Sequence, residues 1–339
     1  MLVSRASVDL RPSPSTAKHL RGRPTLLKCY LELSKARLNA MVVLTTALGY
    51  AVAAKAMLNF DWRALGWVSL GTFLAAAGAS AFNQAWEMSR DSRMDRTKRR
   101  PVPTRAISRG LAVIAGLIAS LTGLAILWMT ANTLTAVLGA INILLYTLVY
   151  TPLKPLSTAN TLAGAVVGGI PPMMGWAAAT GSLSAGAWIL GAILFMWQIP
   201  HFLALAWMYR HDYAKAGFKM IATVEPTGRL TTRLTLLYSA ALIPTAAAMS
   251  LIGHAGWPFA LAATLLGTVL TCLSLKFTAT RADADAKRLF VATIVYLPLL
   301  STALMLDAYG PYDHMLKGEA GYSSPPSADE MFVDPSTVH

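Results

Sequence analysis

Nine long apolar runs constrain the fold of this chain more than any other feature. They cover about residues 38–57, 64–86, 111–130, 134–150, 160–180, 187–208, 234–253, 257–276 and 288–307. A segment of roughly 20 mostly apolar residues is long enough to cross a bilayer as an α-helix. We therefore predict an all-α integral membrane protein with about nine transmembrane helices.

The composition agrees with this prediction. Only 13% of the 339 residues are charged, whereas a soluble domain carries about 25%. The hydrophobic fraction is 55%, and the mean hydropathy is +0.50. The chain has too little polar surface to cover a soluble domain of this size.

The net charge of +13 follows the predicted topology. All of the 29 lysines and arginines except Lys55, Arg63 and Lys317 precede the first apolar run or lie in alternate connections. This is the positive-inside pattern, which places the N-terminus in the cytoplasm or matrix and the C-terminus outside. A nucleic-acid-binding protein would not sort its bases in this way, so we expect no nucleic-acid partner.

The ends of the chain suggest three regions. We predict a basic N-terminal tail over 1–30, a nine-helix domain over 31–308 and a disordered tail over 309–339. The N-terminal segment is rich in Arg and Ser, as transit peptides are, but its prolines spoil an amphipathic helix. A short tail is favoured, and with it a bacterial plasma membrane over the mitochondrial inner membrane.

Two further features of the runs lead to expectations. The stretch "GGIPPMMGW" contains Pro171 and Pro172, which should break or kink a helix. Irregular backbone at that depth marks either a structural kink or the wall of a cavity. Cys29 and Cys272 fall on the reducing side or in the membrane, so no structural disulfide is expected.

The stretch "NQAWEMSRDSRMDRTKRRP" carries polar groups at the end of the second run. Asn83, Glu87 and Asp91 are spaced four apart, so on a helix they share about 80° of one face and climb about 12 Å. Carboxylates near a bilayer usually face a cavity and mark function. Hard oxygen ligands suit Mg²⁺, which binds one or two carboxylates and shares its shell with substrate phosphates.

Many bases surround these acids: Arg90, Arg93, Arg96, Lys98, Arg99, Arg100, Arg105 and Arg109. Such cations bind phosphate oxygens, and Arg does so bidentately. The stretch therefore predicts a cradle for a metal ion and a diphosphate at the membrane surface. The alternative is a solvated helix end that carries topology charges.

A second polar cluster ends the sixth run, in "WQIPHFLALAWMYRHDYAKAGFKM". It places Asp212 beside His211 and Lys215, and its connection lies on the same predicted side as the first cluster. We therefore expect two acid-bearing, base-rich loops to meet over one cavity.

These stretches resemble the protoheme IX farnesyltransferases, or haem O synthases, a branch of the UbiA-type intramembrane prenyltransferase superfamily. The resemblance extends to "SKARLNAMVVLTTALGY" and "YTPLKPLSTANTLAGAVVGGIPPMMGW" and covers roughly residues 30–305. The superfamily's first motif, Asn-x3-Asp-x3-Asp, reads Asn83, Glu87, Asp91 here, and glutamate in the middle is typical of the haem branch. The second motif usually has two acids, but this chain has Asp212 and then Ala216, as the haem branch does.

The resemblance implies nine helices around a central cavity that binds a divalent metal, farnesyl diphosphate and haem B. The implied reaction adds farnesyl and water across a haem vinyl group and yields haem O and diphosphate, for haem A and terminal oxidase biogenesis. Haem A synthase and membrane lipid are the implied partners. The metal, Mg²⁺ or another divalent cation, would be held by Asn83, Glu87, Asp91 and Asp212.

Other side chains are candidates for binding the diphosphate. Arg96, Arg100 and Lys215 are expected to stabilise the charge that develops on the leaving group. Lys154 in "YTPLKPL" either reaches the diphosphate or serves as a topology charge. Tyr146 and Tyr150, at helical spacing, are either packing residues or part of the cavity that binds substrate.

Two histidines are candidates for contact with the haem. We predict that His201, which follows Pro200, positions the haem through its iron or a propionate. The alternative is a histidine hydrogen-bonded to a carbonyl that Pro200 frees. His211, beside the cradle, is the rival candidate.

Two other functions fit parts of the pattern. One is an aromatic or chlorin prenyltransferase of the same superfamily. The other is a multi-pass transporter in which the Asn-Glu-Asp stripe is an ion pathway. A transporter predicts inverted repeats and acids deep within the membrane, whereas here no internal similarity is evident and the acids lie near one surface.

Overall fold

The computed structural model describes residues 25–57 and 59–308. Nine helical spans in this part are long and apolar enough to cross a membrane, which confirms the all-α prediction. Eight are single helices: α2 (Ala36–Ala56), α3 (Trp62–Asp91), α4 (Arg109–Thr130), α7 (Asn160–Thr180), α8 (Ala185–Met208), α11 (Arg229–Leu251), α12 (Trp257–Thr280) and α13 (Asp283–Asp307).

The remaining span, Thr133–Leu153, is composite. It contains α5 (Thr133–Leu144), the π-helical segment η2 (Leu145–Tyr150) and α6 (Thr151–Leu153). Short helices α1 (Leu26–Leu33), α9 (Arg210–Lys215) and α10 (Ile221–Val224) lie outside the spans. The described part has no strand.

The predicted tails lie mainly outside the described residues, which exclude 1–24 and 309–339. Helix α1 begins inside the predicted N-terminal tail, where the side chain of Thr25 caps it by accepting a hydrogen bond from the backbone N–H of Lys28. The nine spans start and end within a few residues of the apolar runs. The main difference is that α3 remains helical through its polar end to Asp91.

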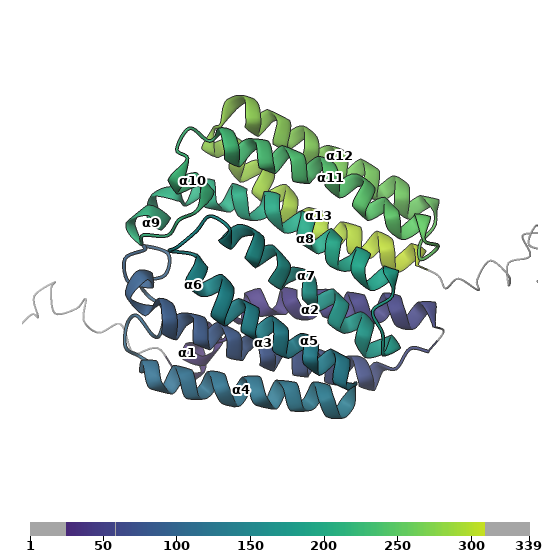
Figure 1. Cartoon of the computed structure of the whole chain (residues 1–339), viewed down its shortest axis with the longest axis horizontal. Coiled ribbons are helices and arrows are strands. Elements are labelled where there is room, and N and C mark those ends of the chain that lie inside the picture. Colours follow the sequence, from purple (N-terminus) through teal and green to yellow (C-terminus); the bar gives the residue numbers. More distant parts are fainter. Residues whose placement is uncertain (1–24, 58, 309–339) are drawn as a thin grey trace, which may run out of the picture.

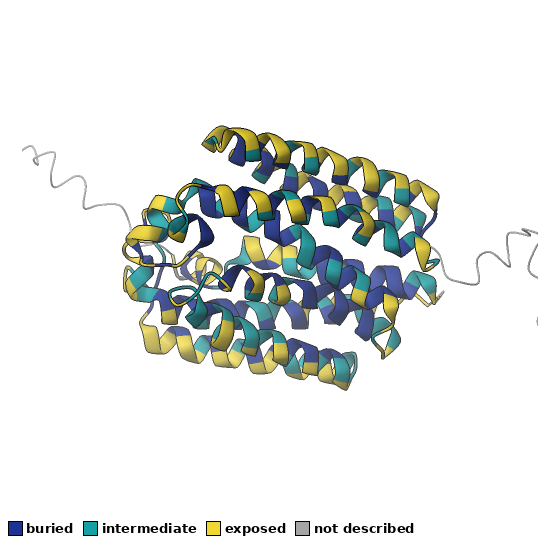
Figure 2. Ribbon diagram, turned by 45° about the horizontal axis from the view of Figure 1, so that its top comes forward, coloured by how far each residue is buried: buried dark blue, intermediate teal, exposed yellow. Residues whose placement is uncertain are grey.

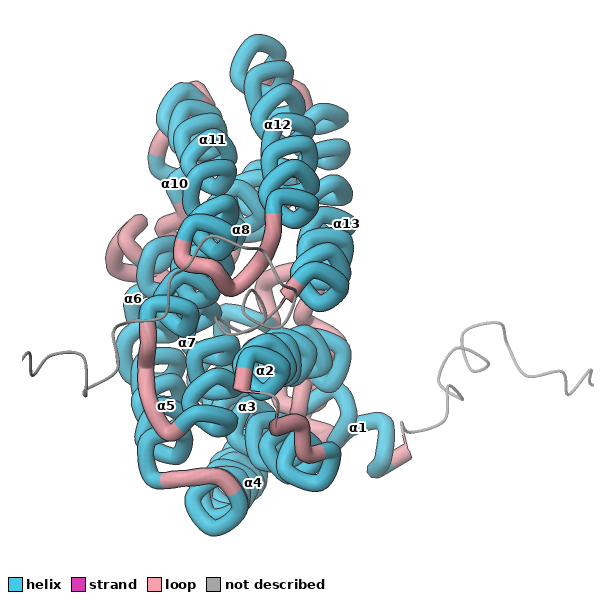
Figure 3. The backbone as a smooth tube through the Cα atoms, turned by 90° about the vertical axis from the view of Figure 1, so that its right-hand side faces the viewer, coloured by secondary structure: helices cyan, strands magenta, loops and turns pink. Residues whose placement is uncertain are grey.

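The helices pack side by side in two groups, which Figure 3 shows nearly end-on. Helices α8, α11, α12 and α13 form one group, and α3, α4 and α5 form much of the other. Helices α2 and α7 lie between them and contact each other closely (Figure 1). Exposed residues lie on the outer helix faces and buried ones inside, as Figure 2 shows. A membrane protein turns its apolar outer surface to lipid.

The contact between α2 and α7 depends on glycine. A Cβ at Gly175 would lie 1.8 Å from the carbonyl oxygen of Thr46, and a Cβ at Gly49 would lie 2.0 Å from that of Pro172. Small residues let membrane helices approach to backbone contact. Of the predicted break or kink at Pro171 and Pro172, the break does not occur, because α7 is continuous from Asn160 to Thr180. Neighbouring helices at this depth can hold a proline-containing helix together.

The loops at one end of the bundle are joined (left in Figure 1). Arg90 at the end of α3 donates to the carbonyl oxygen of Ala216 at 3.1 Å. The backbone N–H of Lys219 donates to the carbonyl oxygen of Lys154 at 2.8 Å. The two base-rich loops therefore meet, as predicted, over one end of the central helices.

Candidate active site

The last turns of α3 place the three polar residues of the stripe on one buried face. Asn83, Glu87 and Asp91 are 0%, 4% and 1% exposed. Helical spacing of four explains why they align, and their burial shows that the stripe is not a solvated helix end. Burying two carboxylates is costly unless each finds a positive partner.

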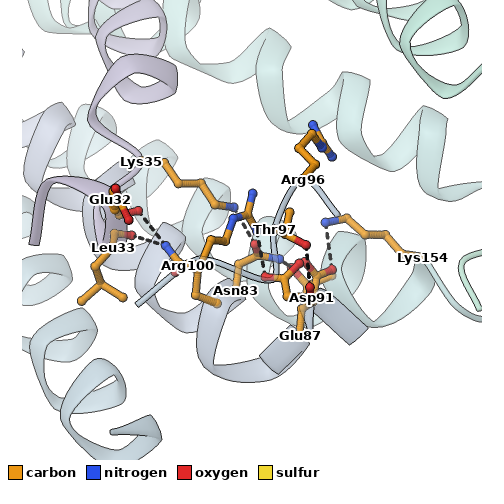
Figure 4. A network of polar contacts seen from close by, with 12 residues as sticks. Glu32, Leu33, Lys35, Asn83, Glu87, Asp91, Arg96, Thr97, Arg100 and Lys154 are labelled. Carbon is orange, nitrogen blue, oxygen red and sulfur yellow. Dashed lines mark hydrogen bonds and ion pairs between the residues drawn. The ribbon is translucent and has the colours of Figure 1, made fainter. Parts of the chain in front are cut away.

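Each residue of the stripe contacts one cation, and each cation comes from a different segment (Figure 4). Lys35, before α2, donates to Asn83 Oδ1 at 2.6 Å. Lys154, just after α6, lies 2.9 Å from Glu87 Oε1. Arg100, in the loop after α3, lies 2.8 Å from Asp91 Oδ2. We call these six residues the cradle: Asn83, Glu87, Asp91, Lys35, Lys154 and Arg100.

Two threonines complete the polar contacts of the stripe. Thr151 accepts a hydrogen bond from Asn83 Nδ2 at 3.0 Å and itself donates to the carbonyl oxygen of Tyr146. Thr97 donates to the carbonyl oxygen of Asp91 at 2.8 Å, which ties the loop after α3 back to the helix end. Asn83 is thereby held with its amide oxygen toward Lys35.

Lys35 is the cradle residue that the sequence did not single out. Its backbone is left-handed, with φ 47°, a conformation that costs a non-glycine residue about 1–2 kcal/mol. Loss of hydration, followed by the nearby charges of Arg100 and Lys154, lowers the pKa of Lys35 to about 7. Strained backbone and crowded positive charge are both typical of functional sites. In the sequence, Lys35 is only one of several bases that precede the first apolar run.

Lys154 differs from Lys35 in its electrostatic surroundings. Burial by itself would lower the pKa of Lys154, but the adjacent Glu87 carboxylate outweighs burial and raises it above its usual range. The ammonium also lies 4.4 Å from the centre of the Tyr150 ring. Lys154 is therefore held charged inside the cradle, where it lines the same cavity as Glu87.

The donor set of the stripe fits a divalent cation shared with a substrate. Asp91 Oδ1 is buried and makes no hydrogen bond among the described residues, so one hard oxygen remains available. The same part of the chain holds no cluster of three or more His, Cys, Asp or Glu side chains suited to a metal ion. Two carboxylates and an amide match Mg²⁺, which usually completes its shell with water and phosphate oxygens.

The cradle opens into a cavity of about 240 Å³. Its lining includes the stripe, all three cations and Arg96, together with His201 and Tyr213 from the region of the second motif. A second cavity, of about 200 Å³, runs deeper between α2, α3, α5, α7 and α8. The two share four lining residues: Leu38, Tyr146, Tyr150 and Phe202.

The deeper cavity is mostly apolar, and helix packing forms its walls. Thr72, Ala76 and Ala79 continue the Asn83 face of α3 along it, and Pro171 lines it from α7. The cavity-wall reading of the proline pair therefore describes Pro171. Tyr146 and Tyr150 line both cavities, with ring centroids 5.4 Å apart, so both belong to the cavity and not only to packing.

Arg96 and Arg100, both predicted from sequence, line the cradle cavity. Arg96 donates to the Tyr213 hydroxyl at 3.1 Å, and its guanidinium lies over the Tyr209 ring. This contact joins the loop after α3 to helix α9.

The residues predicted around the second motif are less closely joined to the stripe. Asp212, His211 and Lys215 do not line either cavity. Lys215 Nζ lies 3.7 Å from both Asp212 Oδ1 and Asp95 Oδ2. The structure therefore brings the second motif to the rim of the cradle but does not place Asp212 among the stripe's oxygens.

His201 lines the cradle cavity from α8. Its Nδ1 lies 2.9 Å from the Thr293 hydroxyl on α13. The expected alternative, a hydrogen bond to a carbonyl freed by Pro200, is not the contact that the ring makes.

The chain is similar to known proteins over most of its length. The model of the UbiA prenyltransferase family matches residues 42–297. A protoheme IX farnesyltransferase from Homo sapiens, described as mitochondrial, is 43% identical over 87% of this chain, which spans 64% of that protein's length. One from Solibacter usitatus is 35% identical over 84% of this chain and 100% of its own length.

Solved structures agree in fold. A structure of digeranylgeranylglyceryl phosphate synthase has a TM-score of 0.70 at 14% identity and covers 83% of this chain and 98% of its own. A UbiA homologue from Archaeoglobus fulgidus, bound to GPP and Mg²⁺, has a TM-score of 0.56 at 12% identity and covers 81% and 99%. On the family match and the curated relatives, the chain belongs to the UbiA prenyltransferase family.

Proposed function

We propose that this protein is a protoheme IX farnesyltransferase that converts haem B, farnesyl diphosphate and water into haem O and diphosphate. The observation that carries the proposal is the cradle, in which two buried carboxylates and an amide each contact a cation at the mouth of an apolar cavity. The names of the relatives support haem B as the acceptor.

Asn83, Glu87 and Asp91 would hold Mg²⁺ or another divalent cation at the stripe, and Asp212 would contact a cation only at the rim of the cradle. When bound, the metal supplies positive charge to the diphosphate leaving group. Arg100, Lys154 and Lys35 would bind those oxygens of the diphosphate that the metal does not contact. Arg96, with Lys215 at the rim, would hold the outer phosphate.

The apolar cavity suits the farnesyl chain. With the diphosphate in the cradle, the chain would pass Tyr146 and Tyr150 and run toward Thr72. Thr72 lies about 16 Å along the helix axis from Asn83. Electron-rich faces of Tyr146 and Tyr150 would lie near the allylic carbon, where rings of this kind stabilise a cation.

The reaction is a substitution followed by an addition. The bond between farnesyl C1 and oxygen breaks, and its electron pair leaves with the diphosphate. The haem vinyl group gives its π electrons to C1, which forms the new carbon–carbon bond and leaves a cation on the other vinyl carbon. Water adds to that cation and loses a proton. The cradle acts by stabilising the charge of the leaving group.

Haem B would enter the cradle cavity with a vinyl group near farnesyl C1. His201 or His211 would contact it, and haem A synthase would receive the product. The protein is a multi-pass membrane protein. The basic loops would face the cytoplasm of a bacterium, with the N-terminus on the same side.

The test is a reconstitution with defined acceptors. Purified protein is incubated with haem B, farnesyl diphosphate and Mg²⁺, and the haem is analysed by mass spectrometry. The expected product is haem that has gained one farnesyl group and one hydroxyl. Parallel reactions supply a hydroxylated aromatic ring or a chlorin instead. Prenylation of either of those, with haem B unchanged, would assign the protein to another branch of the family.

A further inference from the structure

The His201 side chain is held by several groups at the contact between α8 and α13. Nδ1 lies 2.9 Å from Thr293 Oγ1. The ring is stacked with Trp197, one turn earlier on α8, and with Phe290 on α13, at interplanar angles of 20° and 26°. Trp197 Nε1 donates to the carbonyl oxygen of Thr293 at 2.8 Å, so one residue of α13 receives both contacts.

The hydroxyl of Thr293 fixes the tautomer of His201. A hydroxyl has one hydrogen, and that of Thr293 is donated to the carbonyl oxygen of Phe290 at 2.6 Å. With its hydrogen given to that carbonyl, Thr293 accepts from His201, and this arrangement assigns the proton of the neutral imidazole to Nδ1. The lone pair is then on Nε2, which makes no hydrogen bond among the described residues.

The position of the ring limits what Nε2 can bind. Thr293 is fully buried and occupies the Nδ1 edge, while the stacked aromatic rings cover ring surface. His201 also lines the cavity that contains the stripe, and we assign Nε2, the ring nitrogen that Thr293 does not contact, to that cavity. A neutral acceptor nitrogen pairs with a metal ion or a hydrogen-bond donor and repels a carboxylate. Nε2 therefore suits a haem iron and does not suit a haem propionate.

We propose that Thr293 is a positioning residue that holds His201 in the Nδ1–H tautomer, so that His201 Nε2 binds the iron of the haem substrate. The inference rests on the proposed function and makes it more specific, because it assigns the ligand atom and the group that orients it. Histidines that bind metals commonly donate their other N–H to an oxygen in this way.

The test is titration of the full-length protein with haem B, followed by absorbance. The wild type should give the spectrum of imidazole-ligated haem. His201→Ala should lose that spectrum, and added imidazole should restore it. Thr293→Val should weaken haem binding about 10-fold, the lower end for loss of a group that orients a ligand. Thr293→Ser, which keeps the hydroxyl, should bind like the wild type.

Controls separate this role from a structural one. His254→Ala should not change the spectrum, since His254 packs edge-on against Trp176 and lines neither cavity. Farnesyl diphosphate binding should be unchanged in every variant. If the wild type makes haem O while His201→Ala has the same spectrum, the inference is wrong and the proposed function stands. Wild-type affinity in Thr293→Val would overturn the positioning role. A wild type that neither binds nor converts haem would refute the proposed function itself.

Discussion

Glu87 and Asp91 are nearly inaccessible, yet each keeps a charged partner within 3 Å. A buried ion pair of this kind is sensitive to loss of either member, because the survivor stays in a medium that solvates it poorly. The residues that would bind substrate therefore also affect stability, and experiments on them must measure both.

Asp91→Asn and Glu87→Gln should each reduce turnover about 100-fold or more, the usual size of effect for one charge-stabilising group. The amides are isosteric but bind a divalent cation weakly. Formation of haem O is measured across a Mg²⁺ titration, and elution of the purified variants on size exclusion checks their folding. Near wild-type rates for both variants at saturating Mg²⁺ would refute the metal-binding role.

Lys154→Met should destabilise the protein, because it leaves the Glu87 carboxylate without its closest partner. Breaking a buried pair on one side costs about 3–5 kcal/mol. The double variant Lys154→Met/Glu87→Gln should recover most of the loss. Thermal unfolding in detergent measures both, with Lys98→Met as a control in an exposed pair. Equal melting temperatures for the single and double variants would contradict this coupling.

At the scale of elements, η2 and the end of α3 connect the cradle to the apolar cavity. Six residues of π-helix, Leu145–Tyr150, occur where Tyr146 and Tyr150 both line the cavity. Such segments are rare and often occur at functional sites. On α3, the small residues Ala76 and Ala79 precede the stripe in sequence and line the apolar cavity. The depth of the cavity therefore depends on the size of the side chains at these two positions.

Ala76→Leu should shorten the apolar cavity and change the preferred substrate. Farnesyl diphosphate should bind about 10-fold more weakly, because burying or excluding one large side chain's volume is worth roughly 1.5–3 kcal/mol. Geranyl diphosphate, which is shorter, should keep its affinity. Binding of both is measured side by side, with Ala125→Leu on the exposed face of α4 as the control. An equal loss of affinity for both substrates would show that the farnesyl chain does not bind in this cavity.

The elements were predictable because each span is a local property of its own apolar run. The polar ends of the helices were harder to predict than the spans. Helix α3 stays helical to Asp91 because cations from three other segments neutralise or contact its end. The stripe of Asn83, Glu87 and Asp91 could be read from spacing alone. Lys35 could not, since its role depends on a fold that brings it next to a residue far along the chain. The same is true of the pair formed by Thr293 and His201.

The whole molecule places its base-rich loops at one end of the bundle, where they contact one another. The charge asymmetry of the sequence indicates the same arrangement and predicts the compartment that this end faces. That orientation would determine from which side the proposed diphosphate and metal reach the cradle.

Cysteine labelling tests the orientation. In a chain with Cys29 and Cys272 replaced by serine, Ser89→Cys and Thr227→Cys are both exposed and should react with a membrane-impermeant maleimide only from the cytoplasmic side. Arg63→Cys, at the other end of the bundle, should react from the opposite side. Labelling of Ser89→Cys and Thr227→Cys from different sides would contradict the arrangement of the two loops.

The pairing of acids with bases inside the cradle has a consequence for how its ligands arrive. A cation that binds the acids competes with Arg100 and Lys154 for their negative charge, and an anion that binds those bases competes with the acids for their positive charge. Either ligand alone leaves uncompensated charge in a poorly solvated cavity. Each should therefore raise the other's affinity, and linkage requires the two factors to be equal. The protein would respond to the coincidence of metal and diphosphate, while free Mg²⁺ or free phosphate by itself would occupy the site only weakly.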